Sequence, residues 1–199
     1  MRQYDKNSTQ SWAGLARGGV MGGLVGGIVM AMIMMVATAA SGMGFLRPLY
    51  LIAATFHQAW AMAQGVQIGP VFIGLMLHMM NAAVFGLIFA LLLGAITRDK
   101  RAGMATWVIA GMMWGVVLLV INQYVVLRIV DPAMATATAT GAMPAWWVVS
   151  HLMYGVVVGT LVAALAGSSA TRQSVARRAG YRGPRRYVWG HEDARPMAL

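Results

Sequence analysis

Two histidines, His78 and His151, are the residues of this chain whose type and spacing best suit chemistry. Each lies in a long apolar stretch, where an ionisable side chain is costly and is often functional. Both begin the same pattern at matching offsets: His78 is followed by Ala82, Gly86 and Ala90, and His151 by Gly155, Gly159 and Ala163. Those offsets fall near one face of a helix. Because neutral imidazole binds haem iron, copper and zinc, the pair is a candidate cofactor site.

The two histidines admit three interpretations. They could bind a b-type haem axially, with nearby glycines leaving room for the macrocycle. They could bind Cu(I) together with soft thioethers, for which the chain offers Met76, Met79, Met80 and Met153. They could also simply form hydrogen bonds between helices, for which Asn81, Asn122, Gln123 and Tyr154 are partners. The cofactor is therefore left open, with haem b and copper as the alternatives to none.

Catalysis has little support in the sequence. No acidic residue falls inside an apolar stretch, since the acidic residues are Asp5, Asp99, Asp131, Glu192 and Asp193. Proton-coupled transporters generally use buried carboxylates, so this class is disfavoured. No serine, histidine and acid are spaced for hydrolysis either. We therefore predict no catalytic residues and a protein that is not an enzyme.

The histidines must be positioned by membrane-spanning helices. Of the 199 residues, 59% are hydrophobic and 10% are charged, against about 25% charged in a soluble domain. About 20 apolar residues cross a bilayer, and four stretches meet this length, at 18–40, 70–96, 104–127 and 145–167. Continuous apolar runs without alternation indicate helices. The sequence therefore predicts an all-α, four-transmembrane-helix bundle between an N-terminal segment, 1–17, and a C-terminal tail, 168–199.

Lysine and arginine orient these spans. They gather before the first span, between the second and third, and after the fourth, whereas the loops 41–69 and 128–144 hold only Arg47 and Arg128. Positive charge marks the cytoplasmic side. Both termini are therefore expected in the cytoplasm, and a bacterial inner membrane is the expected location.

The histidine pattern also predicts two duplicated helical hairpins. The first and third spans align loosely, with Arg17 matching Arg101, Gly27 matching Gly111 and Ala31 matching Gly115. Parallel repeats of this kind are related by an axis along the membrane normal. Both imidazoles would then lie about 10–12 Å from the outer ends of their helices.

The first span carries paired glycines every four residues, at Gly18, Gly19, Gly22, Gly23, Gly26 and Gly27. Such spacing forms a groove that lets another helix backbone approach closely. The partner is either a helix of the same chain or a helix of another membrane protein, and the sequence admits both.

The two outer loops are expected to differ. Within 45–65, Leu49, Tyr50, Phe56 and Trp60 recur at a spacing that favours a helix lying on the bilayer surface. The alternative is that this loop caps a site above His78 and His151. The alternating Ala and Thr residues of 133–140 are low in complexity and are expected to be irregular.

The tail interleaves aromatic residues with arginines, among them Arg177, Arg178, Arg182, Arg185 and Arg186. Basic segments beside a membrane bind anionic lipid headgroups. The alternative is contact with another membrane-protein subunit. Nucleic acid is set aside, because no folded reading element accompanies the charge.

The stretches that start at His78 and at His151-Leu152-Met153-Tyr154-Gly155, with the glycine-rich first span, resemble the YagU-like group of small four-span bacterial inner-membrane proteins. The resemblance covers roughly 14–167 and omits the tail. It implies four spans and carries over no biochemical activity.

Two functional hypotheses follow from the sequence. The first is a non-catalytic membrane subunit or accessory protein that docks on a larger complex, respiratory or photosynthetic, through the glycine face and the basic tail. The second is a small redox membrane protein that binds haem b or copper through His78 and His151.

Overall fold

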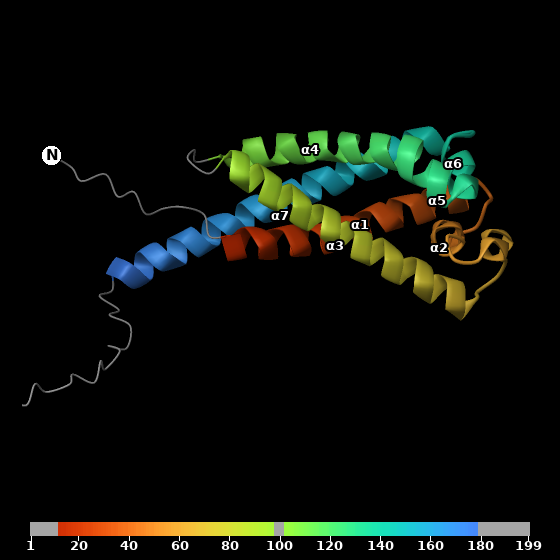
Figure 1. Cartoon of the computed structure of the whole chain (residues 1–199), viewed down its shortest axis with the longest axis horizontal. Coiled ribbons are helices and arrows are strands. Elements are labelled where there is room, and N and C mark those ends of the chain that lie inside the picture. Colours follow the sequence, from red (N-terminus) through yellow and green to blue (C-terminus); the bar gives the residue numbers. More distant parts are fainter. Residues whose placement is uncertain (1–11, 98–101, 179–199) are drawn as a thin grey trace, which may run out of the picture.

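The computed structural model describes residues 12–97 and 102–178, with side chains as far as Leu165. Four of its helices are long and apolar enough to cross a membrane: α1 (Trp12–Ala40), α3 (Ile68–Ile96), α4 (Met104–Ile121) with its continuation to Val130, and α7 (Met143–Arg178), in which the span reaches Leu165 (Figure 1). The chain is therefore an all-α, multi-pass membrane protein, as the sequence predicts.

The helix ends differ from the predicted limits. The helix that starts with α4 continues through a π-helical turn, η2 (Asn122–Val126), into α5 (Leu127–Val130). At the other end of the bundle, α1 begins before the predicted span, and α7 continues past residue 167. The start of α1 and the end of α7 lie at the same end of the bundle, opposite α2, α5 and α6 (Figure 1). The described start of α1 and the described end of α7 thus share one side of the bundle, as the predicted topology requires.

The first outer loop does not form one surface helix. It folds as a short helix, α2 (Arg47–Ala53), and a 3-10 turn, η1 (Gln58–Met62). Leu49 and Tyr50 are buried, whereas Phe56 is 69% exposed, so they do not share one lipid-facing surface. The Tyr50 hydroxyl donates to the backbone oxygen of Gly65 at 2.5 Å and accepts from the backbone N–H of Gln67 at 3.1 Å. These contacts fold the loop over the bundle.

The second outer loop is helical, and the expectation that 133–140 is irregular is wrong. Helix α6 (Pro132–Thr138) begins at Asp131, whose side chain accepts a hydrogen bond from the backbone N–H of Met134 at 2.9 Å. An aspartate at the N-cap and a proline at the first helical position together start a helix efficiently. The Asp131-Pro132 pair therefore outweighs the weak helix preference of the threonines that follow.

Helix α1 packs between α3 and α7, because its paired glycines contact both of these helices. Gly18, Gly22 and Gly26 face α7, and Gly19, Gly23 and Gly27 face α3. A side chain at Gly23 would overlap the backbone of Ala82. All six glycines are buried within the chain. The predicted contact of this face with a partner helix is therefore wrong, and the alternative of packing within the chain is correct.

The two predicted hairpins pack in matching ways. In the first hairpin, Gly23 of α1 meets Ala82 and Gly86 of α3; in the second, Gly111 of α4 meets Gly155 and Gly159 of α7. Ala82 and Gly155 are equivalent in the histidine pattern, and so are Gly86 and Gly159. Gly23 in the first hairpin is therefore the structural equivalent of Gly111 in the second.

By the same comparison, Gly27 is equivalent to Gly115, since Gly27 lies against the helical turn of His78 and Gly115 against that of His151. The sequence alignment had paired Gly27 with Gly111, which is one helical turn out of register. Glycine and alanine recur so often in these spans that the sequence alone does not fix the register of the first and third spans.

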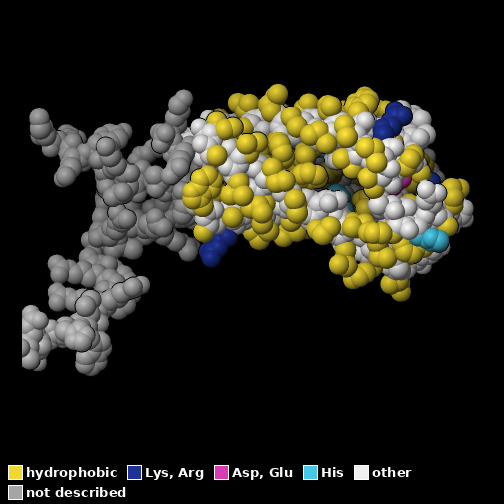
Figure 2. Space-filling view, viewed as in Figure 1, with side chains coloured by type: hydrophobic (Ala, Val, Ile, Leu, Met, Phe, Trp, Pro, Cys, Tyr) yellow, Lys and Arg dark blue, Asp and Glu magenta, His cyan; other side chains and the backbone are white. Residues whose placement is uncertain are grey.

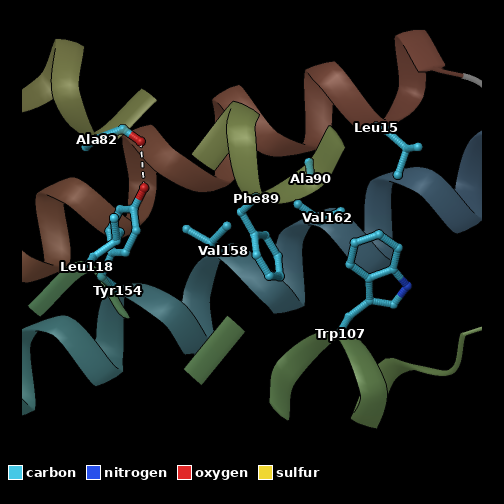
Figure 3. Packing of buried hydrophobic residues seen from close by; sticks show 9 residues of the cluster. All are labelled: Leu15, Ala82, Phe89, Ala90, Trp107, Leu118, Tyr154, Val158 and Val162. Atoms are coloured by element: carbon cyan, nitrogen blue, oxygen red, sulfur yellow. Dashed lines mark hydrogen bonds between the residues drawn. The ribbon is translucent and has the colours of Figure 1, made fainter. Parts of the chain in front are cut away.

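The buried core lies along the junction of the two hairpins (Figure 3). The Phe89 ring of α3 lies between Val158 and Val162 of α7, and Trp107 of α4 lies beyond Val162. The Phe89 and Trp107 rings meet edge to face with centroids 6.1 Å apart. This aromatic contact joins α3 to α4 at the end of the bundle where the chain passes from one helix to the other.

Candidate functional site

A cavity of about 190 Å³ lies in the half of the bundle nearest α2, α5 and α6, and both candidate histidines line it. Its walls are mainly apolar. The polar side chains of the lining include His78, Asn81, Asn122, Asp131, His151 and Tyr154. The space-filling view shows the molecule hollowed on this face, with histidine atoms visible inside the hollow (Figure 2). The structure thus brings together the two histidines that the sequence singles out.

His78 is held by α1. Its Nε2 donates a hydrogen bond to the backbone oxygen of Gly27 in α1 at 2.8 Å. The oxygen of a peptide group can only accept, so Nε2 carries the proton. In the neutral ring, Nδ1 then remains as a hydrogen-bond acceptor or metal ligand.

His151 is buried at 1% exposure and is oriented by its own helix. Its Nδ1 donates to the backbone oxygen of Trp147 at 2.9 Å, and the Trp147 ring packs against it with centroids 4.3 Å apart. Its Nε2 lies 3.4 Å from the side-chain nitrogen of Asn122, from which it accepts a hydrogen bond. Each histidine therefore has one ring N–H bound to a backbone oxygen and the other nitrogen free of a proton.

The π-helical turn η2 positions Asn122 and is hydrogen-bonded to α6. The side chain of Gln123, next to Asn122, donates to the backbone oxygen of Ala135 at 3.0 Å and accepts from the Thr138 hydroxyl at 2.7 Å. Single π-helical turns within α-helices are frequent at functional sites. Here the turn joins the Asn122 contact with His151 to α6, which covers the outer end of the cavity.

Asp131 and Trp147 are site residues that the sequence analysis did not assign to the site. Asp131 is 4% exposed, and its Oδ2 has no hydrogen-bond partner among the described residues. The indole N–H of Trp147 is likewise buried without a described partner, and both residues line the cavity. Burial raises the pKa of the Asp131 carboxyl, and backbone hydrogen bonds from Met134 and Ala133 oppose that rise. The capping signal of Asp131-Pro132 is the one sequence feature that could have indicated this burial.

A haem does not fit this cavity. An engineered protein cavity of about 150 Å³ takes up one benzene molecule, so the volume of about 190 Å³ suits one six-membered ring and not a porphyrin. The His78 Nε2 is also engaged with Gly27.

Copper fits the histidines better than haem does. Ligating histidines commonly donate their second ring N–H to a backbone carbonyl, as His78 and His151 both do. The methionines predicted for copper, Met76, Met79, Met80 and Met153, do not line the cavity, whereas Met30 and Met134 do. Within the described part of the chain, no group of three or more histidine, cysteine, aspartate or glutamate side chains could hold a metal ion. A copper site would therefore depend on these two thioethers.

The remaining predicted contact residues do not join the site. The six glycines of α1 pack against α3 and α7. Helix α7 includes Arg177 and Arg178, whose side chains the structure does not describe, and the remaining predicted tail contacts, Arg182, Arg185 and Arg186, lie outside the described residues. Comparisons of the chain with protein-family models, curated proteins and solved structures each gave no match.

Proposed function

We propose that this chain is a non-catalytic integral membrane protein that binds a small molecule in the cavity between His78 and His151. The observation that carries the proposal is that the buried His151 and the partly buried His78 line one cavity together with an unpartnered carboxylate oxygen of Asp131. An unpaired buried acceptor costs free energy that a bound hydrogen-bond donor recovers. Mainly apolar walls with a few converging polar groups are typical of ligand sites.

A copper-binding redox protein is the second candidate. It is supported by the one unprotonated ring nitrogen that each histidine retains, which in His151 accepts from Asn122, and by the two methionine thioethers in the lining. Imidazole and thioether are ligands that suit Cu(I). Haem b, the other cofactor considered, is not proposed, because the cavity is too small.

The accessory-subunit hypothesis loses one of its two docking surfaces. The glycine face is covered by α3 and α7, and the tail arginines are not described. A role within a larger membrane complex remains compatible with ligand binding, and the tail, with anionic headgroups or another subunit as its partner, is the surface left for it.

The expected setting is part of the same proposal. The positive charge of the sequence supports cytoplasmic termini in a bacterial inner membrane. The four spans and the histidine motifs support membership in the YagU-like group. The cavity then lies in the half of the membrane farther from the cytoplasm.

The test is to purify the full chain from its native membrane in mild detergent, then measure bound metals by elemental analysis and bound organic molecules by mass spectrometry. We expect an organic molecule at up to one per chain that is lost in a His78→Ala, His151→Ala double variant. The control is His57→Ala, because His57 is exposed and does not line the cavity. Bound copper that is lost in the double variant would establish the copper-binding candidate. If the double variant retains the same amounts of bound metal and organic molecule as the parent protein, both candidates are refuted.

A further inference from the structure

We infer that the cavity is entered sideways from the lipid, between α3 and α4, by a molecule with one hydroxyl-bearing six-membered ring and an apolar tail. This inference rests on the proposed binding function and names the ligand class and its route.

The route follows from a difference between two equivalent helix pairs. The pairing of Gly23 with Gly111 and of His78 with His151 makes the α1–α7 contact equivalent to the contact of α4 with α3. Helices α1 and α7 pack tightly, with Gly18, Gly22 and Gly26 against Val162, Val158 and Tyr154. Helices α3 and α4, in contrast, touch very little. They lie together where the chain passes from one to the other and diverge toward α2 and α5 (Figure 1).

The side chains explain this difference. The positions in α4 that correspond to Gly22 and Gly26 hold Ala110 and Trp114. In α3, Phe85 and Phe89 correspond to the smaller Val158 and Val162. The rings of Trp114 and Phe89 lie with centroids 6.3 Å apart. Bulky rings thus replace glycine and valine, and they keep α3 and α4 from closing over the cavity.

A polar residue marks the resulting opening. Asn81 of α3 lines the cavity and is exposed on the outside of the bundle, where lipid would surround it. Its side-chain amide makes no hydrogen bond to a described residue. A polar group that faces hydrocarbon without a partner is costly. The cost is recovered when a polar head passes or stays beside Asn81.

The volume limits the head of the ligand. A cavity of about 150 Å³ holds one benzene molecule, and the present one has about 190 Å³. One ring with small substituents therefore fills it. A longer apolar tail has no room inside, and it would extend between α3 and α4 into the bilayer.

The free polar atoms select hydroxyl groups over carbonyl groups. The Asp131 Oδ2 needs a donor, and the His78 Nδ1 accepts in the neutral ring, whereas the Trp147 N–H needs an acceptor. Each hydroxyl donates one hydrogen bond and can also accept, so two hydroxyls on the ring together serve all three atoms. A quinone carbonyl only accepts and leaves the two acceptors unpaired. The reduced, dihydroxy form of a tailed ring is therefore preferred over the oxidised form.

The experiment uses the full chain in detergent-free lipid nanodiscs, with tryptophan fluorescence as the readout. Three probes are compared under anaerobic conditions: a decyl-substituted hydroquinone, the matching decyl quinone, and the hydroquinone ring without a tail. We expect the tailed hydroquinone to bind about a hundredfold more tightly than the quinone, since the quinone leaves two acceptors unpaired and each unpaired buried group costs about tenfold. The probe without a tail should bind more weakly, because its partition into lipid is lower.

A pair of neighbouring variants tests the route. Asn81→Trp should obstruct the opening and weaken binding of the tailed hydroquinone about tenfold, by loss of roughly one polar contact. Met80→Trp is the matched control, because Met80 is exposed on the same helix and does not line the cavity; it should leave binding unchanged.

Each contrary result refutes one part of the inference. Equal or tighter binding of the quinone overturns the preference for hydroxyl groups. Entry from the lipid is refuted if the ring without a tail binds as tightly as the tailed hydroquinone. It is also refuted if the Asn81→Trp variant binds the tailed hydroquinone as tightly as the parent protein does. If no probe binds while the purified protein carries another molecule or copper that depends on the histidines, this inference fails and the proposed function stands. If nothing depends on the histidines, both fail.

Discussion

The hydroxyl of Tyr154 in α7 donates a hydrogen bond of 2.6 Å to the backbone oxygen of Ala82 in α3 (Figure 3). Helices α3 and α7 belong to different hairpins, and Gly26 of α1 lies against the Tyr154 ring. The bond therefore links the two hairpins alongside α1, next to the cavity that Tyr154 and Ala82 both line.

Tyr154→Phe is expected to destabilise the protein slightly. Hydrogen bonds between transmembrane helices contribute about 0.6 kcal/mol on average. The Ala82 oxygen keeps its place in the helix ladder of α3, so no buried acceptor is left alone. Thermal unfolding in detergent should show a small decrease in Tm, while Tyr124→Phe, at an exposed site, should show none. A decrease as large as that of a core truncation would contradict this account.

Two substitutions of Asp131, by alanine and by asparagine, should change the stability of the protein in opposite directions. Asp131→Ala removes the cap of α6 and should cost about 1 kcal/mol, whereas Asp131→Asn retains a capping side chain. Because burial raises the pKa of this carboxyl in the folded protein, its stabilising contribution is complete below the unfolded pKa and is lost as pH rises through the folded one.

Asp131→Asn should therefore be more stable than the parent protein at neutral pH, with the difference disappearing in acid. Thermal unfolding over a series of pH values measures this. A neutral-pH loss in Asp131→Asn equal to that in Asp131→Ala would show that the charge itself is needed.

The packing of α1 against α3 predicts a strong effect of one methyl group. A Cβ at Gly23 would overlap backbone atoms of Ala82, which cannot move aside as a side chain can. Gly23→Ala should cost about 1–3 kcal/mol, the range for overpacking a tight contact. Gly69→Ala, in the same pair of helices but with nothing within 4 Å of its Cβ, should cause no loss. Equal unfolding temperatures of the two variants would refute the internal role of the α1 glycines.

The separation of α3 and α4 should depend on Trp114. The chain has no cysteine, so two introduced cysteines can carry spin labels without competing sites. With labels at Phe72 and Tyr124, both exposed near the outer ends of their helices, Trp114→Ala should shorten the distance between the labels. Trp146→Ala, on α7, is the control and should leave it unchanged. An unchanged distance in Trp114→Ala would show that another contact holds the helices apart.

The spans and the pair of histidines could be predicted from the sequence because both signals are local. A long uncharged run has few alternatives to a membrane helix, and a histidine inside one stands out. The shared offsets after His78 and His151 also predicted that the two side chains lie at one level, and both indeed line one cavity.

Other features depend on contacts that a sequence does not specify. Paired glycines suit a helix of the same chain as well as a foreign one, so the partner of Gly23 could not be chosen in advance. The register of the first and third spans was missed by one turn because nearly every fourth residue is small. Asp131 appeared to be a loop residue, since its burial arises only when α6 folds over the end of α4.

The unequal packing of the two hairpins has a consequence for synthesis at the ribosome. Helix α1 finds its partner α3 as soon as the first hairpin has been made, because the two are joined by glycine contacts. Helix α4 contacts α3 very little and packs mainly against α7, which is the last span to emerge. The nascent chain therefore holds a formed first hairpin and a solitary α4 in the membrane until α7 arrives, and assembly is completed by the C-terminal helix.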